Sequence, residues 1–169
     1  MRHAPALWVV GMLLPLAGCA SAGREAYDAT RLAPGSAEEF ARQFVRAVTD
    51  ADTDRAMQLF ISRDEFEKHL EGDERDYRRR EQQDRQAVRH LIGWLADGSY
   101  VSLYTRTKEP RTIQPGGEET PAVKVPTPSF DQARVWVKSS GRLHEVYLGV
   151  LLKVDGTWRF IDPPHIPGR

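Results

Sequence analysis

The sequence predicts an α+β fold, in which N-terminal helices precede an antiparallel β-sheet. Between residues 36 and 98, apolar residues recur at helical spacing, whereas after Gly98 they recur at every second position. Turn signals, including Asp155-Gly156, separate the apolar runs of the C-terminal third. Helices that precede a run of hairpin-connected strands are typical of the α+β class.

The first helix is expected to begin at Ser36. Ser36 and Glu39 form a Ser-x-x-Glu pattern, in which the two side chains satisfy free amides at a helix N-terminus. Four apolar residues then follow at helical spacing, namely Phe40, Phe44, Val45 and Val48.

Two shorter helices are expected next. Residues Ala51 to Phe60 form the second, with Asp52 or Thr53 as its N-cap. Ser62 and Glu65 repeat the capping-box pattern and begin a third helix. The apolar residues of this third helix are Phe66 and Leu70.

A long helix is expected from Glu71 to Gly98, where the glycine suits a C-terminal cap. Its second half is amphipathic, whereas residues 71–89 mix acidic and basic side chains in equal number. Such mixed charge favours a solvated helix with weak ion pairs. The alternative is that Arg78-Arg79-Arg80 contacts phosphate, lipid headgroups or an acidic partner.

The pattern after Gly98 predicts strands. Tyr100 to Thr107 reads as the first strand. Residues 108–128 hold five prolines, so they do not form one uninterrupted central strand. An edge hairpin that turns at Pro115-Gly116-Gly117 and a mobile loop both fit this segment.

Asp131 to Lys138 and Leu143 to Val154 are predicted to pair through a turn at Ser140-Gly141. A two-residue loop fixes which residues lie opposite each other. One face would then hold the pairs Val137/His144, Val135/Val146 and Ala133/Leu148, and the other Trp136/Glu145 and Arg134/Tyr147.

A last strand is expected from Thr157 to Ile161, after the Asp155-Gly156 turn. Asp162-Pro163-Pro164 should end the sheet, because proline donates no backbone hydrogen bond. Residues 163–169 are then a C-terminal tail.

The N-terminus reads as a signal peptide of residues 1–18. Met1 to His3 is a short basic start, and Ala6 to Ala17 is an apolar run too short to span a bilayer. Leu16-Ala17-Gly18-Cys19 resembles the lipobox of bacterial lipoproteins, a family in which the cysteine is acylated and becomes the new N-terminus. The alternatives are ordinary secretion, with cleavage near Ala20-Ser21-Ala22, or an uncleaved anchor.

Cys19 is the only cysteine, so no internal disulfide can form, and lipidation would account for a lone thiol in an exported chain. The resemblance implies palmitate-type acylation of Cys19 and a membrane-anchored protein of the cell envelope. In the family that the motif resembles, an acidic residue after the cysteine often signals retention at the inner membrane, so the resemblance, with an alanine at position 20, implies the outer membrane. The expected organisation is therefore an acylated Cys19 with a flexible tether over residues 19–35, then a single domain over residues 36–162.

Charge and motifs exclude several function classes. Lys plus Arg equals Asp plus Glu, at 24 each, whereas nucleic-acid binding calls for a basic face. The sequence contains none of the common nucleotide, hydrolase or metalloprotease motifs. Glu65 and His69, with His90 further on, are too few for a metal site, and the first two are expected to form an exposed helix contact. We expect no cofactor.

Three features look like the nuclear-transport-factor-2-like superfamily: the apolar spacing of residues 40–60, the Val- and Leu-rich strand 146–154, and Val154-Asp155-Gly156-Thr157-Trp158-Arg159-Phe160. The resemblance covers roughly residues 36–162. It implies a cystatin-like cone, in which helices pack on a strongly curved sheet, and it leaves a homodimer through the sheet open. The superfamily includes isomerases, cyclases and many non-enzymatic domains, so the fold does not fix the function.

His144 is the best candidate for a polar group in a pocket of the cone, because its strand position shares a face with Val135 and Val146. Its alternative is a strand-end histidine without a catalytic role. Tyr104, Trp136 and Tyr147 are candidates to line such a pocket, although aromatic residues on strands more often serve packing. No catalytic residue is carried over from the superfamily.

We therefore expect a non-enzymatic binding or accessory module that takes a small hydrophobic ligand or an envelope protein as its partner. The first alternative is a cofactor-independent isomerase- or cyclase-like enzyme, with a polar residue in the cone. The second is a structural subunit that uses the charged helix over residues 71–89 as its contact surface.

Overall fold

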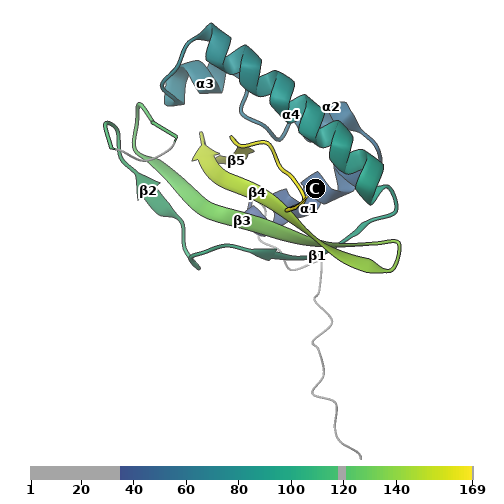
Figure 1. Ribbon diagram of the computed structural model, residues 1–169. Coiled ribbons are helices and arrows are strands. Elements are labelled where there is room, and N and C mark those ends of the chain that lie inside the picture. Colours follow the sequence, from purple (N-terminus) through teal and green to yellow (C-terminus); the bar gives the residue numbers. More distant parts are fainter. Residues whose placement is uncertain (1–34, 118–120, 169) are drawn as a thin grey trace, which may run out of the picture. The chain divides into compact units, whose positions relative to one another are not determined.

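The computed structural model describes residues 35–117 and 121–168. Helices are followed by a curled antiparallel sheet that forms a half-barrel, which confirms the predicted α+β class (Figure 1). The helices are α1 (Ala37–Thr49), α2 (Thr53–Met57), α3 (Arg63–His69) and α4 (Glu74–Leu95). The strands are β1 (Ser99–Tyr104), β2 (Arg111–Ile113), β3 (Thr127–Ser139), β4 (Arg142–Val154) and β5 (Thr157–Phe160).

The helices begin where side chains cap them. Ser36 accepts a hydrogen bond from the backbone N–H of Glu39, and Ser62 forms a complete capping box with Glu65. α4 begins three residues later than expected, because Asp73 and Asp76 form a capping box of their own there.

Gly98 does not cap α4 as expected, since the helix ends at Leu95. A Cβ atom at Gly98 would lie 2.8 Å from a methyl carbon of Val137 on β3. The glycine therefore allows the chain to pass close to the sheet, which is a requirement of packing and not of helix termination.

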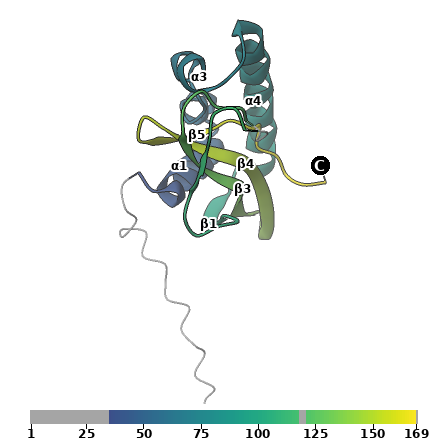
Figure 2. The ribbon, with the colours of Figure 1, turned by 90° about the vertical axis from the view of Figure 1, so that its left-hand side faces the viewer.

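The sheet order is β1-β3-β4-β5, with β2 pairing to β3. Most of the expected register between β3 and β4 is confirmed. The pair Ala133/Leu148 is wrong, because Ala133 lies opposite Gly149 across a β-bulge. Leu148 is the extra residue of this bulge and the following Gly149 adopts a φ of +73°; the bulge bends the long strand, whose curl is visible in Figure 2.

Two apolar clusters stabilise the domain. The larger one lies between the helices and the sheet, and its centre is the ring of Phe160, with Phe40, Phe44 and Phe60 at centroid distances of 4.6, 4.7 and 5.0 Å. The smaller cluster includes Leu152 and other residues of β4, α3 and the segment before β3. Because Leu152 alternates with Leu151 of the larger cluster, this end of β4 is buried on both faces.

Residues 108–128 and residues 163–169, for which the sequence allows a loop and a tail, both pair in part with the sheet. β2 pairs with residues 127–129 at the start of β3, so part of the proline-rich segment is an edge strand. After β5, His165 forms an antiparallel bridge with Tyr147, and Ile166 is buried in the larger cluster. The C-terminal segment thus runs between α4 and β4 (Figure 1).

Candidate functional site

The four residues expected to line a pocket lie on two different faces of the sheet. His144 lies opposite Val137 on the face that packs against the helices. Trp136 and Tyr147 lie at strand positions whose side chains point to the other face. Tyr104 lies opposite Arg134, which itself lies opposite Tyr147, so Tyr104 is on that face too. These three aromatic residues therefore share the outer face, away from His144.

None of the four candidates lines any of the three pockets described below. Tyr104 is exposed at 54%, and the ring of Tyr147 packs against that of His165, with centroids 5.2 Å apart. The structure does not bring these residues together into one site.

The expected contact between Glu65 and His69 is also absent, because the two side chains have other partners. Glu65 binds Arg159 of β5. His69 is buried, with its Nε2 atom 3.4 Å from a carboxylate oxygen of Asp155. Within residues 35–117 and 121–168, no group of three or more potential ligands is arranged to hold a metal ion.

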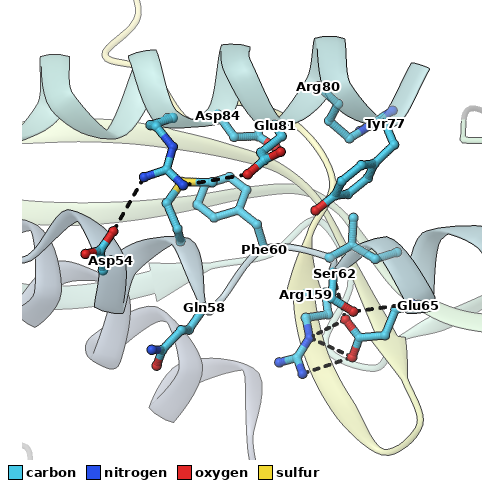
Figure 3. Close-up of a pocket in the computed structure, with 13 residues that line it drawn as sticks. Asp54, Gln58, Phe60, Ser62, Glu65, Tyr77, Arg80, Glu81, Asp84 and Arg159 are labelled. Atoms are coloured by element: carbon cyan, nitrogen blue, oxygen red, sulfur yellow. Dashed lines mark hydrogen bonds and ion pairs between the residues drawn. The ribbon is translucent and has the colours of Figure 1, made fainter. Parts of the chain in front are cut away.

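The best-defined candidate site is a pocket of about 380 Å³ between α4 and the chain that runs from α2 to α3 (Figure 3). Its volume lies within the range of small-molecule sites, which is roughly 300–1,000 Å³. Apolar walls come from Met57, Phe60, Ile61 and the ring of Tyr77. Polar groups come from α4, from α2, from α3 and from Arg159 of β5.

Asp84 of α4 is the unusual residue of this pocket. It occupies the same helical stripe as Val88, Leu91 and Leu95, which are the buried residues of α4. Only 2% of Asp84 is exposed, and its Oδ1 atom has no hydrogen-bond partner among the described residues. Buried carboxylates are normally paired or hydrogen-bonded, so this arrangement calls for an explanation.

The surroundings of Asp84 disfavour its charged form. Burial raises the pKa of Asp84 from its ordinary value of 3.8 to about 7; the Arg80 guanidinium opposes this rise, whereas the carboxylates of Asp162 and Glu81 add to it. Asp84 is therefore partly protonated at neutral pH. A carboxyl group of this kind in a pocket is a candidate for binding or proton transfer.

Most of the other charges of the pocket are already paired. Arg159 donates to both carboxylate oxygens of Glu65 from its Nε atom at 3.0 Å. Burial alone would raise the pKa of Glu65, but hydrogen bonds from Arg159 and from the backbone N–H of Ser62 outweigh it and leave the pKa below its ordinary value. Arg85 is paired in the same way, at 3.5 Å from Asp54 and 3.6 Å from Glu81.

The spacing of residues along α4 could have identified Asp84, although a count of its charged residues could not. Asp84 counts as one of several acidic residues in the charged half of α4, and most of those are exposed and ion-paired as expected. However, it precedes Val88 by one helical turn and so extends the apolar stripe toward the N-terminus. A charged residue at a core position of an amphipathic helix is the pattern that identifies it.

Two further pockets adjoin α4. One of about 350 Å³ lies between α4 and the C-terminal segment and is lined by residues such as Ala87, Leu91 and Ile166. The other, of about 270 Å³, lies near Asp76, Arg79 and Asp162. Neither is lined by Asp84, so the pocket in Figure 3 is the one in which an unpaired buried carboxyl group meets an apolar wall.

The chain matches no protein-family model, no curated protein and no solved structure in comparisons with known proteins. The helices of the described segments are all too short or too polar to cross a bilayer. The predicted signal peptide, Cys19 and the tether lie outside the described residues. The site must therefore be interpreted from its own chemistry.

Proposed function

We propose that this protein is a lipid-anchored lipoprotein of the cell envelope whose domain binds a small organic ligand in the pocket between α2, α3 and α4. The lipobox-like Leu16-Ala17-Gly18-Cys19 motif supports the anchor, with the outer membrane as its expected place. The N-terminal acyl groups would hold the domain at the membrane surface.

The observation that carries the binding function is the buried, unpaired carboxyl group of Asp84 in this pocket. An aliphatic residue at this position would complete the apolar stripe of α4 and would avoid the cost of burying a polar group. Proteins tolerate such destabilising groups mainly at functional sites. A ligand that pairs with the free oxygen gives the carboxyl group a function that offsets its cost.

The enzyme alternative has less support. Enzymes of the resembled superfamily hold their catalytic groups inside the cone, where this chain packs Phe40, Phe44, Phe60 and Phe160. His144 would need a substrate cavity beside it, and it lines none of the three pockets described above. A binding module that uses the pocket in Figure 3, which lies beside this aromatic cluster at Phe60, fits the geometry better.

The proposal can be tested by native mass spectrometry of the lipidated protein, gently extracted from its own membrane. Glu81→Trp places a large ring at the mouth of the pocket, whereas Arg78→Trp adds the same ring to an exposed position of the same helix. We expect wild type and Arg78→Trp to retain the same small mass and Glu81→Trp to lose it. A wild-type protein without bound small mass, or equal retention by all three proteins, would contradict the proposal.

A further inference from the structure

The pocket in Figure 3 has an excess of negative charge close to Asp84. Carboxylates line it from Asp54, Glu65, Glu81 and Asp84, and guanidinium groups from Arg80, Arg85 and Arg159. Arg85 and Arg159 are held in ion pairs with the other carboxylates. The charged groups that act on Asp84 itself are the guanidinium of Arg80 and the carboxylates of Asp162 and Glu81, and Glu81 is also paired with Arg85.

The apolar part of the pocket is adjacent to this unpaired carboxyl group. Asp84 and Tyr77 both lie on α4, and the chain that faces this helix contributes Phe60 (Figure 3) together with Met57 and Ile61. A ligand that fits both parts needs a hydrocarbon body and a group that donates a hydrogen bond or carries positive charge. The negative surroundings favour a positive charge over a neutral donor.

We propose that the ligand of this pocket is an organic amine with an apolar body, and that its ammonium group forms an ion pair with the carboxylate of Asp84. This inference rests on the proposed binding function and specifies the chemical class of the ligand. A metal ion is a poorer match, since no group of three or more suitable ligands is present in the described part of the chain. One ammonium group needs only one or two acceptors, and Asp84 has a free one.

The proposal fixes a pH dependence. The amine needs the ionised form of Asp84, whose pKa is about 7 in the free protein. The charged groups that act on Asp84 are Arg80 and Glu81 of α4 and Asp162 after β5; the other titratable residues of the lining are Asp54, Tyr77, Arg85 and the Glu65–Arg159 pair. Affinity for an amine that stays protonated should therefore rise by about 10-fold between pH 6 and pH 8, because Asp84 ionises in this range.

Phenethylamine and phenethyl alcohol form a suitable pair of probes, since they differ only in ammonium against hydroxyl. Each is titrated into the full-length protein, and the backbone amide signals of Phe60 and Tyr77 are followed by NMR at pH 6 and pH 8. We expect the amine to bind at least about 10-fold more tightly than the alcohol at pH 8, as a charge-assisted hydrogen bond predicts. In Asp84→Asn the advantage of the amine and its pH dependence should both disappear.

A measurement on the wild-type protein covers the case in which Asp84→Asn does not fold. The carboxyl carbon of Asp84 is titrated by NMR with and without each probe, and the amine alone should lower the pKa of Asp84. Equal binding of both probes in the pocket, without pH dependence, would overturn the amine assignment and leave the proposed binding function intact. If neither probe shifts signals of the pocket at saturating concentrations, both proposals are overturned.

Discussion

At the scale of single residues, Asp84 shows how one side chain can oppose the stability of its own helix. Only 2% of the residue is exposed, and it lies on the stripe that Val88, Leu91 and Leu95 use for packing. A buried polar group without a partner costs roughly 1–3 kcal/mol in proteins, and more when it is charged. The domain therefore tolerates the free-energy cost of burying the Asp84 carboxyl group at the position where it lines the pocket.

We expect Asp84→Leu to raise the free energy of unfolding by about 1–4 kcal/mol at pH 8, because it replaces an unpaired carboxylate with a side chain that extends the apolar stripe. Urea denaturation of the two proteins measures the difference. Gln82→Leu, at an exposed position of α4, controls for helix propensity and should change stability by less than about 0.5 kcal/mol. A destabilised Asp84→Leu protein would show that Asp84 has a stabilising partner.

The raised pKa of Asp84 predicts how stability changes with pH. Between about pH 4 and pH 7, the folded protein keeps a proton on Asp84 that the unfolded chain has lost. The stabilisation that comes from binding this proton is therefore fully present below about pH 4 and is lost as the pH rises through about 7. The difference in unfolding free energy between Asp84→Leu and wild type should accordingly grow between pH 4 and pH 7. A difference that does not change with pH would rule out the raised pKa.

Gly149 is a second residue whose surroundings determine what the position accepts. Its φ is +73°, and an added Cβ would lie 2.5 Å from the Cβ of Asp162. Gly141 has a similar φ of +75°, but an added Cβ there would meet no atom within 4 Å. The two glycines therefore separate backbone strain from crowding.

Gly149→Ala should lower the free energy of unfolding by about 3 kcal/mol, since it combines left-handed backbone strain with overpacking. Gly141→Ala should cost about 1 kcal/mol, because only the strain applies. Thermal and urea denaturation of both variants would measure these values. An equal decrease in the free energy of unfolding for both variants would mean that Asp162 shifts to accommodate the added methyl group without a free-energy cost.

At the scale of elements, an ion pair links α3 to the last strand. Arg159 of β5 and Glu65 of α3 have side chains only 20% and 17% exposed, and Glu65 also caps its own helix through the backbone N–H of Ser62. Ion pairs of α3 at the surface differ from this one. Arg63 and Glu67 are both more than half exposed.

Arg159→Met should lower the free energy of unfolding by about 2 kcal/mol, because it leaves the half-buried carboxylate of Glu65 without its main partner. Glu67→Gln removes an exposed pair of α3 and should cost less than about 0.5 kcal/mol. Chemical denaturation of both variants at pH 7 tests the comparison. A similar small effect for both would show that solvent replaces the guanidinium of Arg159.

The elements that local chemistry specifies were the easiest to predict. The Ser36 and Ser62 caps and the Asp155-Gly156 turn lie where they were expected, because each depends on residues within one turn of the chain. The bulge at Gly149 could not be predicted in this way. It depends on Asp162, whose carboxylate accepts the backbone N–H of Val150 from 12 residues away in sequence.

At the scale of the whole molecule, the packed aromatic interior and the pocket beside it separate two tasks. Phe160 and its neighbours hold helices and sheet together, so the larger cluster serves stability. The pocket lies at its border, where Phe60 contributes both to the cluster and to the pocket wall. A site at such a border can bind a ligand without opening the core.

The proposed anchor gives a prediction for the full chain. Mass spectrometry of the mature protein should find an N-terminus at Cys19 that carries acyl groups, because a thioether-linked lipid requires this thiol. Cys19→Ser should abolish the acyl mass and remove stable membrane attachment of the processed chain. A mature wild-type chain that begins near Ala20-Ser21-Ala22 without acyl groups would contradict the lipoprotein assignment.

The sequence by itself determined the α+β class, the caps at Ser36 and Ser62, the hairpin turns and most of the register between β3 and β4, because these follow from hydrophobic periodicity and from local hydrogen bonding. Only the tertiary structure decided that Tyr104 shares the outer face of the sheet with Trp136 and Tyr147, and that Asp84 is buried beside a pocket. The physical reason is that desolvation and shared cavities arise from segments far apart in the chain, which no local pattern encodes.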